Sequence, residues 1–251
     1  MTTIFGIKTN SGLDAIVLAA DTQSNIYYGS SARKVIETKI REEKDYVIAS
    51  AGTSTKLVER FFSYIYGRTT PKIFIREALR NKTHPIFLNL PENPVHTAIE
   101  AGYFPELALV NSDYYISKNG DESYEEIFDN LTEFIVVTRK PLGLYHVDPF
   151  GRVNTSPHNV DFITIGSGSE MAQTYILEAE YQDDPNLPDV KAEIREDRIT
   201  LPVAMSLAIG SLKRASKEKD TGGPIDLVVI TEEIIDVLGP DIRRDLTESD
   251  R

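Results

Sequence analysis

The chain contains no cysteine and only four histidines. The absence of cysteine excludes disulfides, thiol nucleophiles and cysteine-based zinc sites. No two histidines have the spacing of a metal-binding pair, and each is expected in a loop or at the surface. A serine or cysteine triad therefore has little support, and we expect neither a metal nor a cofactor. The four histidines are His84, His96, His146 and His158.

Long apolar runs and excess positive charge are also missing. No segment approaches the roughly 18 consecutive apolar residues that a membrane span needs. No basic segment followed by an apolar core opens the chain, so we expect no signal peptide and a cytoplasmic location. The net charge of −12 argues against a nucleic-acid surface. The 251 residues, of which 41% are hydrophobic and 26% charged, predict one globular domain spanning 1–251.

The first fifty residues predict two β-hairpins. Strands at 2–9 and 14–21 flank a turn that contains glycine, and strands at 34–40 and 45–51 form the second pair. The polar residues 22–33 between the two hairpins predict an irregular loop.

Two helices follow, one over 56–66 and one beginning near Pro71. Residues 82–131 contain prolines, isolated apolar runs and an acidic stretch. This segment has too few periodic apolar positions to build its own core, so it predicts an elongated connection and not a separate domain.

The second half repeats the order of strands before helices. Helices are predicted from Ser169 and from Thr200 to about Lys217, and a tight turn at 148–151. Strand groups that are each followed by helices predict segregated layers. The fold class is therefore α+β, with two sheets face to face and helices outside. The strands are predicted at 133–138, 144–147, 162–165 and 224–231.

A threonine directly follows the initiator methionine. Methionine is generally removed before a small residue, which would leave Thr2 with a hydroxyl and a free α-amine. An α-amine titrates near 7.7–8.0, a suitable range for a general base. A hydroxyl paired with such a base is an activated nucleophile.

Five segments carry a family resemblance. In chain order they are 2–21, 39–52, 144–151, 165–169 and 221–226. Together they resemble proteasome β-subunits and the related HslV-type threonine peptidases, over about two thirds of the chain. That resemblance implies the N-terminal nucleophile hydrolase fold, a four-layer αββα sandwich.

The resemblance also implies catalytic roles. Thr2 corresponds to the nucleophile, with its own amine as base. Asp21 and Lys39 correspond to the buried carboxylate and lysine beside it, and such an ammonium would lower the pKa of the Thr2 hydroxyl. Gly52 corresponds to the residue whose backbone N–H stabilises the tetrahedral intermediate.

Supporting roles are implied for residues on either side of the site. Ser167 would bind the terminal amine, with Thr221 as its partner, and Ser50 would line the substrate pocket. Two assignments stay open because the spacing departs from the family pattern. Lys34 competes with Lys39 for the lysine position. The acidic residue before the closing turn is either Glu218 or Asp220.

The function implied is a threonine endopeptidase of a self-compartmentalised, proteasome-like protease acting on proteins or peptides. Its partners would be further copies or related subunits in a ring and an ATPase unfoldase ring, with no nucleic acid and no membrane. Two alternatives remain, because fold does not fix function. One is a non-catalytic scaffold subunit, and the other is an amidase or transpeptidase that uses the same threonine.

Overall fold

The computed structural model describes residues 2–28, 31–36, 39–52, 94–104, 107, 131–155, 161–179, 198–217 and 222–238. Side chains at 23–28, 31–36, 94 and 179 are outside this description. The predicted helices at 56–66 and near Pro71, and most of the 82–131 connection, also lie outside it.

The chain divides into two compact units. The first consists of Met1–Ala51, Phe134–His146 and Thr155–Arg251, and the second of Gly52–Glu133 and Val147–Asn154. The prediction of one domain over 1–251 stays a prediction.

The first sheet is antiparallel, and the beginning of the chain lies inside it. Its strand order is β10-β1-β2-β11-β12. Strand β1 pairs with β2 on one side and with β10 on the other, which confirms the predicted first hairpin. The strands are β1 (Thr3–Lys8), β2 (Ile16–Asp21), β10 (Phe162–Gly166), β11 (Ile225–Ile230) and β12 (Ile235–Val237).

Four strands of the second sheet lie in the first unit except for one end residue each of β7 and β8, and their order is β5-β6-β7-β8. The predicted strand 45–51 is confirmed from Tyr46, but the predicted partner strand 34–40 is wrong, because the strand that pairs here is Ile40–Glu42 and shares only Ile40 with it. The predicted strand 133–138 is confirmed, and the following one begins two residues earlier than expected. The four are β5 (Ile40–Glu42), β6 (Tyr46–Ala51), β7 (Glu133–Arg139) and β8 (Leu142–Val147).

The prediction of an irregular loop at 22–33 is wrong. Strands β3 (Gln23–Tyr28) and β4 (Ser31–Ile36) pair as a separate two-stranded sheet, with Tyr28 opposite Ser31. The sequence does contain a signal for a hairpin, although its polar composition favoured a loop. A Gly-Ser pair separates the two strands, and glycine in the first position is typical of two-residue hairpin loops.

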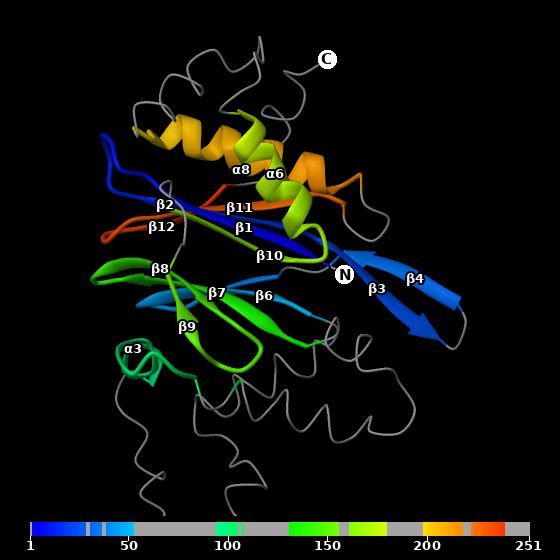
Figure 1. Cartoon of the computed structure of the whole chain (residues 1–251), viewed down its shortest axis with the longest axis horizontal. Helices are drawn as coiled ribbons and strands as arrows, with labels where there is room; N and C mark the ends of the chain where they lie inside the picture. Colours follow the sequence, from blue (N-terminus) through cyan, green and yellow to red (C-terminus); the bar gives the residue numbers. More distant parts are fainter. Residues whose placement is uncertain are drawn as a thin grey trace, which may run out of the picture. The chain divides into compact units, whose positions relative to one another are not determined.

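Strands β1 and β2 present apolar side chains to both faces of their sheet. Ile4 and Leu18 join a core that also contains Val47 and Ile135 of the second sheet. Phe5 joins a separate core with residues of the helical layer. Successive side chains of a strand point to opposite faces, so the continuous apolar runs match strands buried on both sides. Figure 1 shows β6, β7 and β8 on one side of this sheet and two helices on the other.

Those helices are α6 (Ser169–Ala179) and α8 (Leu201–Ala215), and both were predicted. Thr200 is the N-cap of α8, a proline follows in the first turn, and Lys213 and Arg214 occupy the last turn. The buried stripe of α8 includes Val203 and Leu207, which pack in the same core as Phe5. Among the described helices, none is both long and apolar enough to cross a membrane.

The second unit contains helix α3 (Pro94–Glu100), which the sequence analysis did not predict, and strand β9 (Val153–Asn154). The predicted turn at 148–151 is confirmed, because the Gly151 N–H donates to the Asp148 carbonyl at 2.8 Å. The Asp148 carboxylate also accepts hydrogen bonds from the backbone N–H groups of Phe150 and Arg152.

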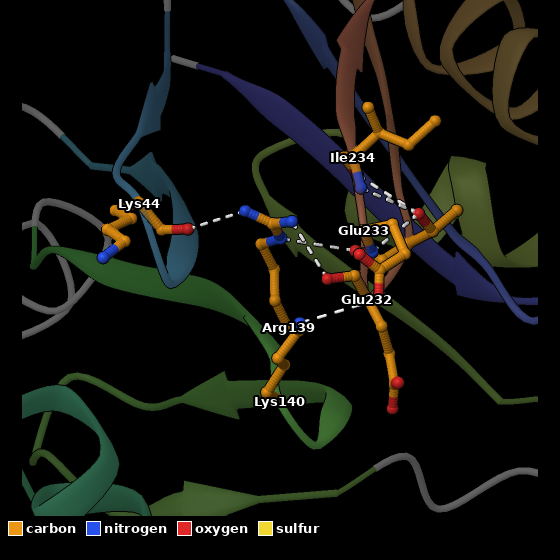
Figure 2. A network of polar contacts seen from close by, with 7 residues as sticks. Lys44, Arg139, Lys140, Glu232, Glu233 and Ile234 are labelled. Carbon is orange, nitrogen blue, oxygen red and sulfur yellow. Dashed lines mark hydrogen bonds and ion pairs between the residues drawn. The ribbon is translucent and has the colours of Figure 1, made fainter.

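Arg139, at the end of β7, connects two turns of the first unit. Its guanidinium donates to the carbonyl of Lys44 at 2.8 Å, before β6. It also donates to the carbonyls of Glu232 at 2.9 Å and Thr231 at 3.4 Å, after β11. Figure 2 shows Arg139 reaching Lys44 on one side and the 232–234 turn on the other. The Arg139 side chain thus links the β5–β6 turn of the second sheet to the β11–β12 turn of the first.

We expect Arg139→Met to lower the free energy of unfolding by about 1–3 kcal/mol, because carbonyls of two turns lose a charged donor. The neighbouring Lys140→Met is the matched control. Lys140 and Glu233 form an ion pair at 3.6 Å with side chains 65% and 82% exposed, and pairs of this kind contribute little. Urea denaturation of both variants gives the comparison. Equal losses would contradict the role of Arg139.

Candidate active site

Several strand ends of the first unit meet beside Thr2. Thr2 lies just before β1, and Asp21 is the last residue of β2, so antiparallel pairing puts the two at the same end of the sheet. Lys39 directly precedes β5 in the second sheet. The N–H of Ser50 donates to the Lys39 carbonyl at 3.2 Å, which fixes the lysine backbone against β6.

The side chains of Thr2, Lys39 and Asp21 come together in a buried group. The Lys39 ammonium donates a hydrogen bond to the Thr2 hydroxyl. Lys39 Nζ also lies 3.9 Å from Asp21 Oδ1, as an ion pair. Thr2 is 4% exposed, and the side chains of Lys39 and Asp21 are 8% and 4% exposed. Low exposure strengthens the electrostatic effect of the ammonium on the hydroxyl.

Asp21 is held by more than the lysine. Its Oδ2 accepts a hydrogen bond from the Gly222 N–H at 3.1 Å. Burial raises the pKa of Asp21 from 3.8 to about 6, and this effect outweighs the Gly222 hydrogen bond, the charge of Lys39 and the Thr3 amide, all of which lower it. The carboxylate thus gives up hydration that its partners only partly replace.

Ser167 contacts Thr2 through its backbone. Its N–H donates to the Thr2 carbonyl at 3.0 Å, directly after β10. The predicted hydrogen bond from the Ser167 side chain to a free terminal amine stays a prediction. Ser50 is half-buried, near the end of β6, and its role in a substrate pocket also stays a prediction.

Gly52 belongs to the second unit. Its φ is +143°, and a Cβ there would lie 2.8 Å from the Cα of Thr132 and 2.9 Å from its Oγ1. Backbone conformation and packing therefore both require glycine. Gly52 is exposed, as the predicted role of its N–H needs.

Three predicted site residues lie outside the described residues: Glu218, Asp220 and Thr221. The choice between the two acidic residues therefore stays open. Lys34 lies in β4 opposite Asn25, and its side chain is not described. Lys39 is the lysine that the structure brings to Thr2 and Asp21.

Sequence reasoning missed the donors that hold Asp21. The Gly222 and Thr3 N–H groups are backbone atoms, so no residue type marks them. The pair Gly222-Gly223 signalled a turn, but nothing connected that turn to a carboxylate 201 positions earlier.

The arrangement can activate a hydroxyl. A buried ammonium that donates to an oxygen stabilises the negative charge which develops there when the proton leaves. Among the described residues, no cluster of His, Asp or Glu side chains could hold a metal ion.

No family model matches the chain, and the search of curated proteins found no match.

The raised pKa of Asp21 predicts a pH-dependent cost to folding. Between about pH 4 and about pH 6 the unfolded chain releases this proton while the folded chain keeps it, so stability falls as pH rises. Asp21→Asn removes this cost. The stability of the variant relative to the unsubstituted chain should therefore rise by roughly 3 kcal/mol across that window and then stay level.

Urea denaturation at a series of pH values measures this difference. Asp14→Asn is the control for the loss of one negative charge, because the Asp14 side chain is 66% exposed. A difference between Asp21→Asn and the unsubstituted chain that does not vary with pH would contradict the prediction.

Proposed function

We propose that this protein is a threonine endopeptidase of a proteasome-like, self-compartmentalised protease. The observation that carries the proposal is the contact of the Lys39 ammonium with the Thr2 hydroxyl, with Asp21 3.9 Å from the same nitrogen. The residue before β1, the last residue of β2 and the residue before β5 supply these three side chains. Their juxtaposition is what the resemblance to threonine peptidases requires.

The layer order supports the four-layer αββα fold. Helices α6 and α8 cover one face of the first sheet, and the second sheet covers the other. The side chains of the second sheet that point away from the first, such as Ile48, Phe134 and Val136, are also buried.

The first chemical step uses the two groups of a free N-terminal threonine. After Met1 is removed, the α-amine takes the proton of the Thr2 hydroxyl, through a water molecule. The Thr2 oxygen then forms a bond to the carbonyl carbon of a peptide. The Lys39 ammonium stabilises the negative charge on the attacking oxygen, and its charge favours the neutral, basic form of the nearby amine.

The tetrahedral intermediate places a negative charge on the former carbonyl oxygen. The resemblance assigns the role of donor to that oxyanion to the N–H of Gly52. A donor of this kind contributes about 3–4 kcal/mol to transition-state stabilisation.

Collapse of the intermediate breaks the C–N bond, and the α-ammonium returns the proton to the leaving amine. Thr2 is then esterified with the first part of the substrate. Water, deprotonated by the same amine, hydrolyses the ester and regenerates the hydroxyl.

The resemblance extends the proposal to assembly. Active sites would lie inside a chamber built from rings of this chain or of related subunits, and an ATPase ring would unfold and deliver substrate proteins. A cytoplasmic location belongs to the same proposal.

Intact-mass spectrometry tests the nucleophile. A threonine-directed epoxyketone closes a ring with both the hydroxyl and the free α-amine, so the unsubstituted chain should have lost one methionine and gain one adduct. Thr2→Val should lose the adduct. Thr3→Val is the matched control and should keep it, because the Thr3 hydroxyl is buried and makes no hydrogen bond among the described residues.

Each contrary result selects an alternative. Retained Met1 with no adduct would contradict the catalytic proposal and favour a scaffold subunit. An adduct at Thr2 accompanied by peptide transfer to an added amine, without hydrolysis, would favour a transpeptidase.

We expect Lys39→Met to lower kcat/KM for a fluorogenic peptide by about 100-fold or more, because the developing charge on Thr2 loses its counter-charge. Lys8→Met is the control. Lys8 also forms an ion pair with an aspartate, but at 4.0 Å with its side chain 30% exposed. Full activity of Lys39→Met would exclude Lys39 from the mechanism.

A further inference from the structure

Gly166 is the last residue of β10, and it lies against the backbone of Thr2. It pairs with Thr3 in the antiparallel register, and its φ is +89°. A Cβ at this position would overlap the Thr2 carbonyl oxygen. It would also lie 2.8 Å from the carbonyl carbon of Thr2 and 3.2 Å from the Cβ of Ala51.

The Thr2 carbonyl occupies the space that a side chain at 166 would fill. From there it accepts the hydrogen bond of the Ser167 N–H at 3.0 Å. The side-chain hydroxyl of Thr2 accepts a second hydrogen bond, from the Lys39 ammonium. Thr2 is therefore held at two points, its carbonyl by the end of β10 and its hydroxyl by the lysine.

We propose that Gly166 is a positioning residue for the nucleophile, acting through the Thr2 carbonyl. The absence of a side chain lets the end of β10 approach the Thr2 carbonyl closely enough for the Ser167 N–H to bind it. The kinetic consequences rest on the proposed peptidase function, whereas the structural consequence does not.

The chain provides a matched control for the strain of a side chain at positive φ. Gly12 has φ +80°, close to that of Gly166, but a Cβ there would meet no atom within 4 Å. Gly12→Ala and Gly166→Ala therefore carry similar backbone strain. Only the second overlaps Thr2, so the difference between the two variants reports chiefly the contact with Thr2, together with a tight approach of 3.2 Å to the Cβ of Ala51.

Peptidase kinetics and thermal unfolding are measured for both variants and the unsubstituted chain. Gly166→Ala should lower kcat by about 100-fold with KM changed by less than about 2-fold, because the nucleophile moves while the substrate still binds. Epoxyketone adduct formation should slow in parallel. Gly12→Ala should keep kcat, with a smaller fall in Tm than Gly166→Ala, because its Cβ meets no atom within 4 Å.

A crystal structure of Gly166→Ala tests the proposal without reference to activity. The Thr2 hydroxyl should have left its hydrogen bond with the Lys39 ammonium. An unchanged contact would overturn the proposal. If the unsubstituted chain forms no adduct, the proposed peptidase function is rejected. The crystal structure of Gly166→Ala still decides whether Gly166 positions Thr2.

Two further results would count against the inference. Gly166→Ala with undiminished kcat would overturn it. Failure of Gly166→Ala to fold, when Gly12→Ala folds, would show that the glycine serves the fold and not the position of Thr2.

Hydrogen exchange in the unsubstituted chain needs no variant. The Ser167 amide should exchange slowly although this residue is exposed, because its N–H is bonded to Thr2. Exchange at the rate of an unprotected amide would contradict the proposed contact.

Discussion

The carboxylate of Asp21 loses most of its hydration on folding, and the ammonium of Lys39 lies 3.9 Å away with its side chain also buried. The hydrogen bond from Gly222 and the charge of Lys39 favour the ionised form, yet burial dominates and raises the pKa of Asp21 to about 6. Keeping the ionised Asp21 carboxylate buried beside Thr2 therefore lowers the free energy of unfolding. Such a cost is expected at a site arranged for chemistry and is unusual in a purely structural core.

Strand pairing determines which groups meet around this ion pair. Because β1 lies between β2 and β10, the beginning of the chain is fixed on both sides, by Asp21 at the end of one neighbour and by Gly166 at the end of the other. A nucleophile near a chain terminus would otherwise be poorly ordered. The interior position of β1 in the sheet orders Thr2, as its proposed role as a nucleophile would need.

Much of the fold was predictable, because β1, β2 and α8 have strong apolar patterns with clear boundaries. Thr2 was proposed because it directly follows the initiator methionine, and Asp21 because the segment that ends in it resembles the threonine-peptidase family. The β3–β4 hairpin was missed because its polar composition gave no two-residue alternation. Lys34 therefore stayed a competing candidate beside Lys39, the preferred lysine. The Gly222 and Ser167 amides were beyond sequence reasoning, because any residue except proline offers the same donor.

Lys39 comes from the second sheet and Thr2 from the first, so their contact depends on how closely the two sheets pack. The core between the sheets contains large side chains such as Leu18 and Ile135, but alanines occupy it next to the site. Ala20 precedes Asp21, and Ala51 adjoins Gly166. Protein interiors are closely packed, so small side chains allow facing backbones to approach. Small side chains at these positions, which look like ordinary core residues in the sequence, are consistent with the close approach that lets Lys39 reach the Thr2 hydroxyl.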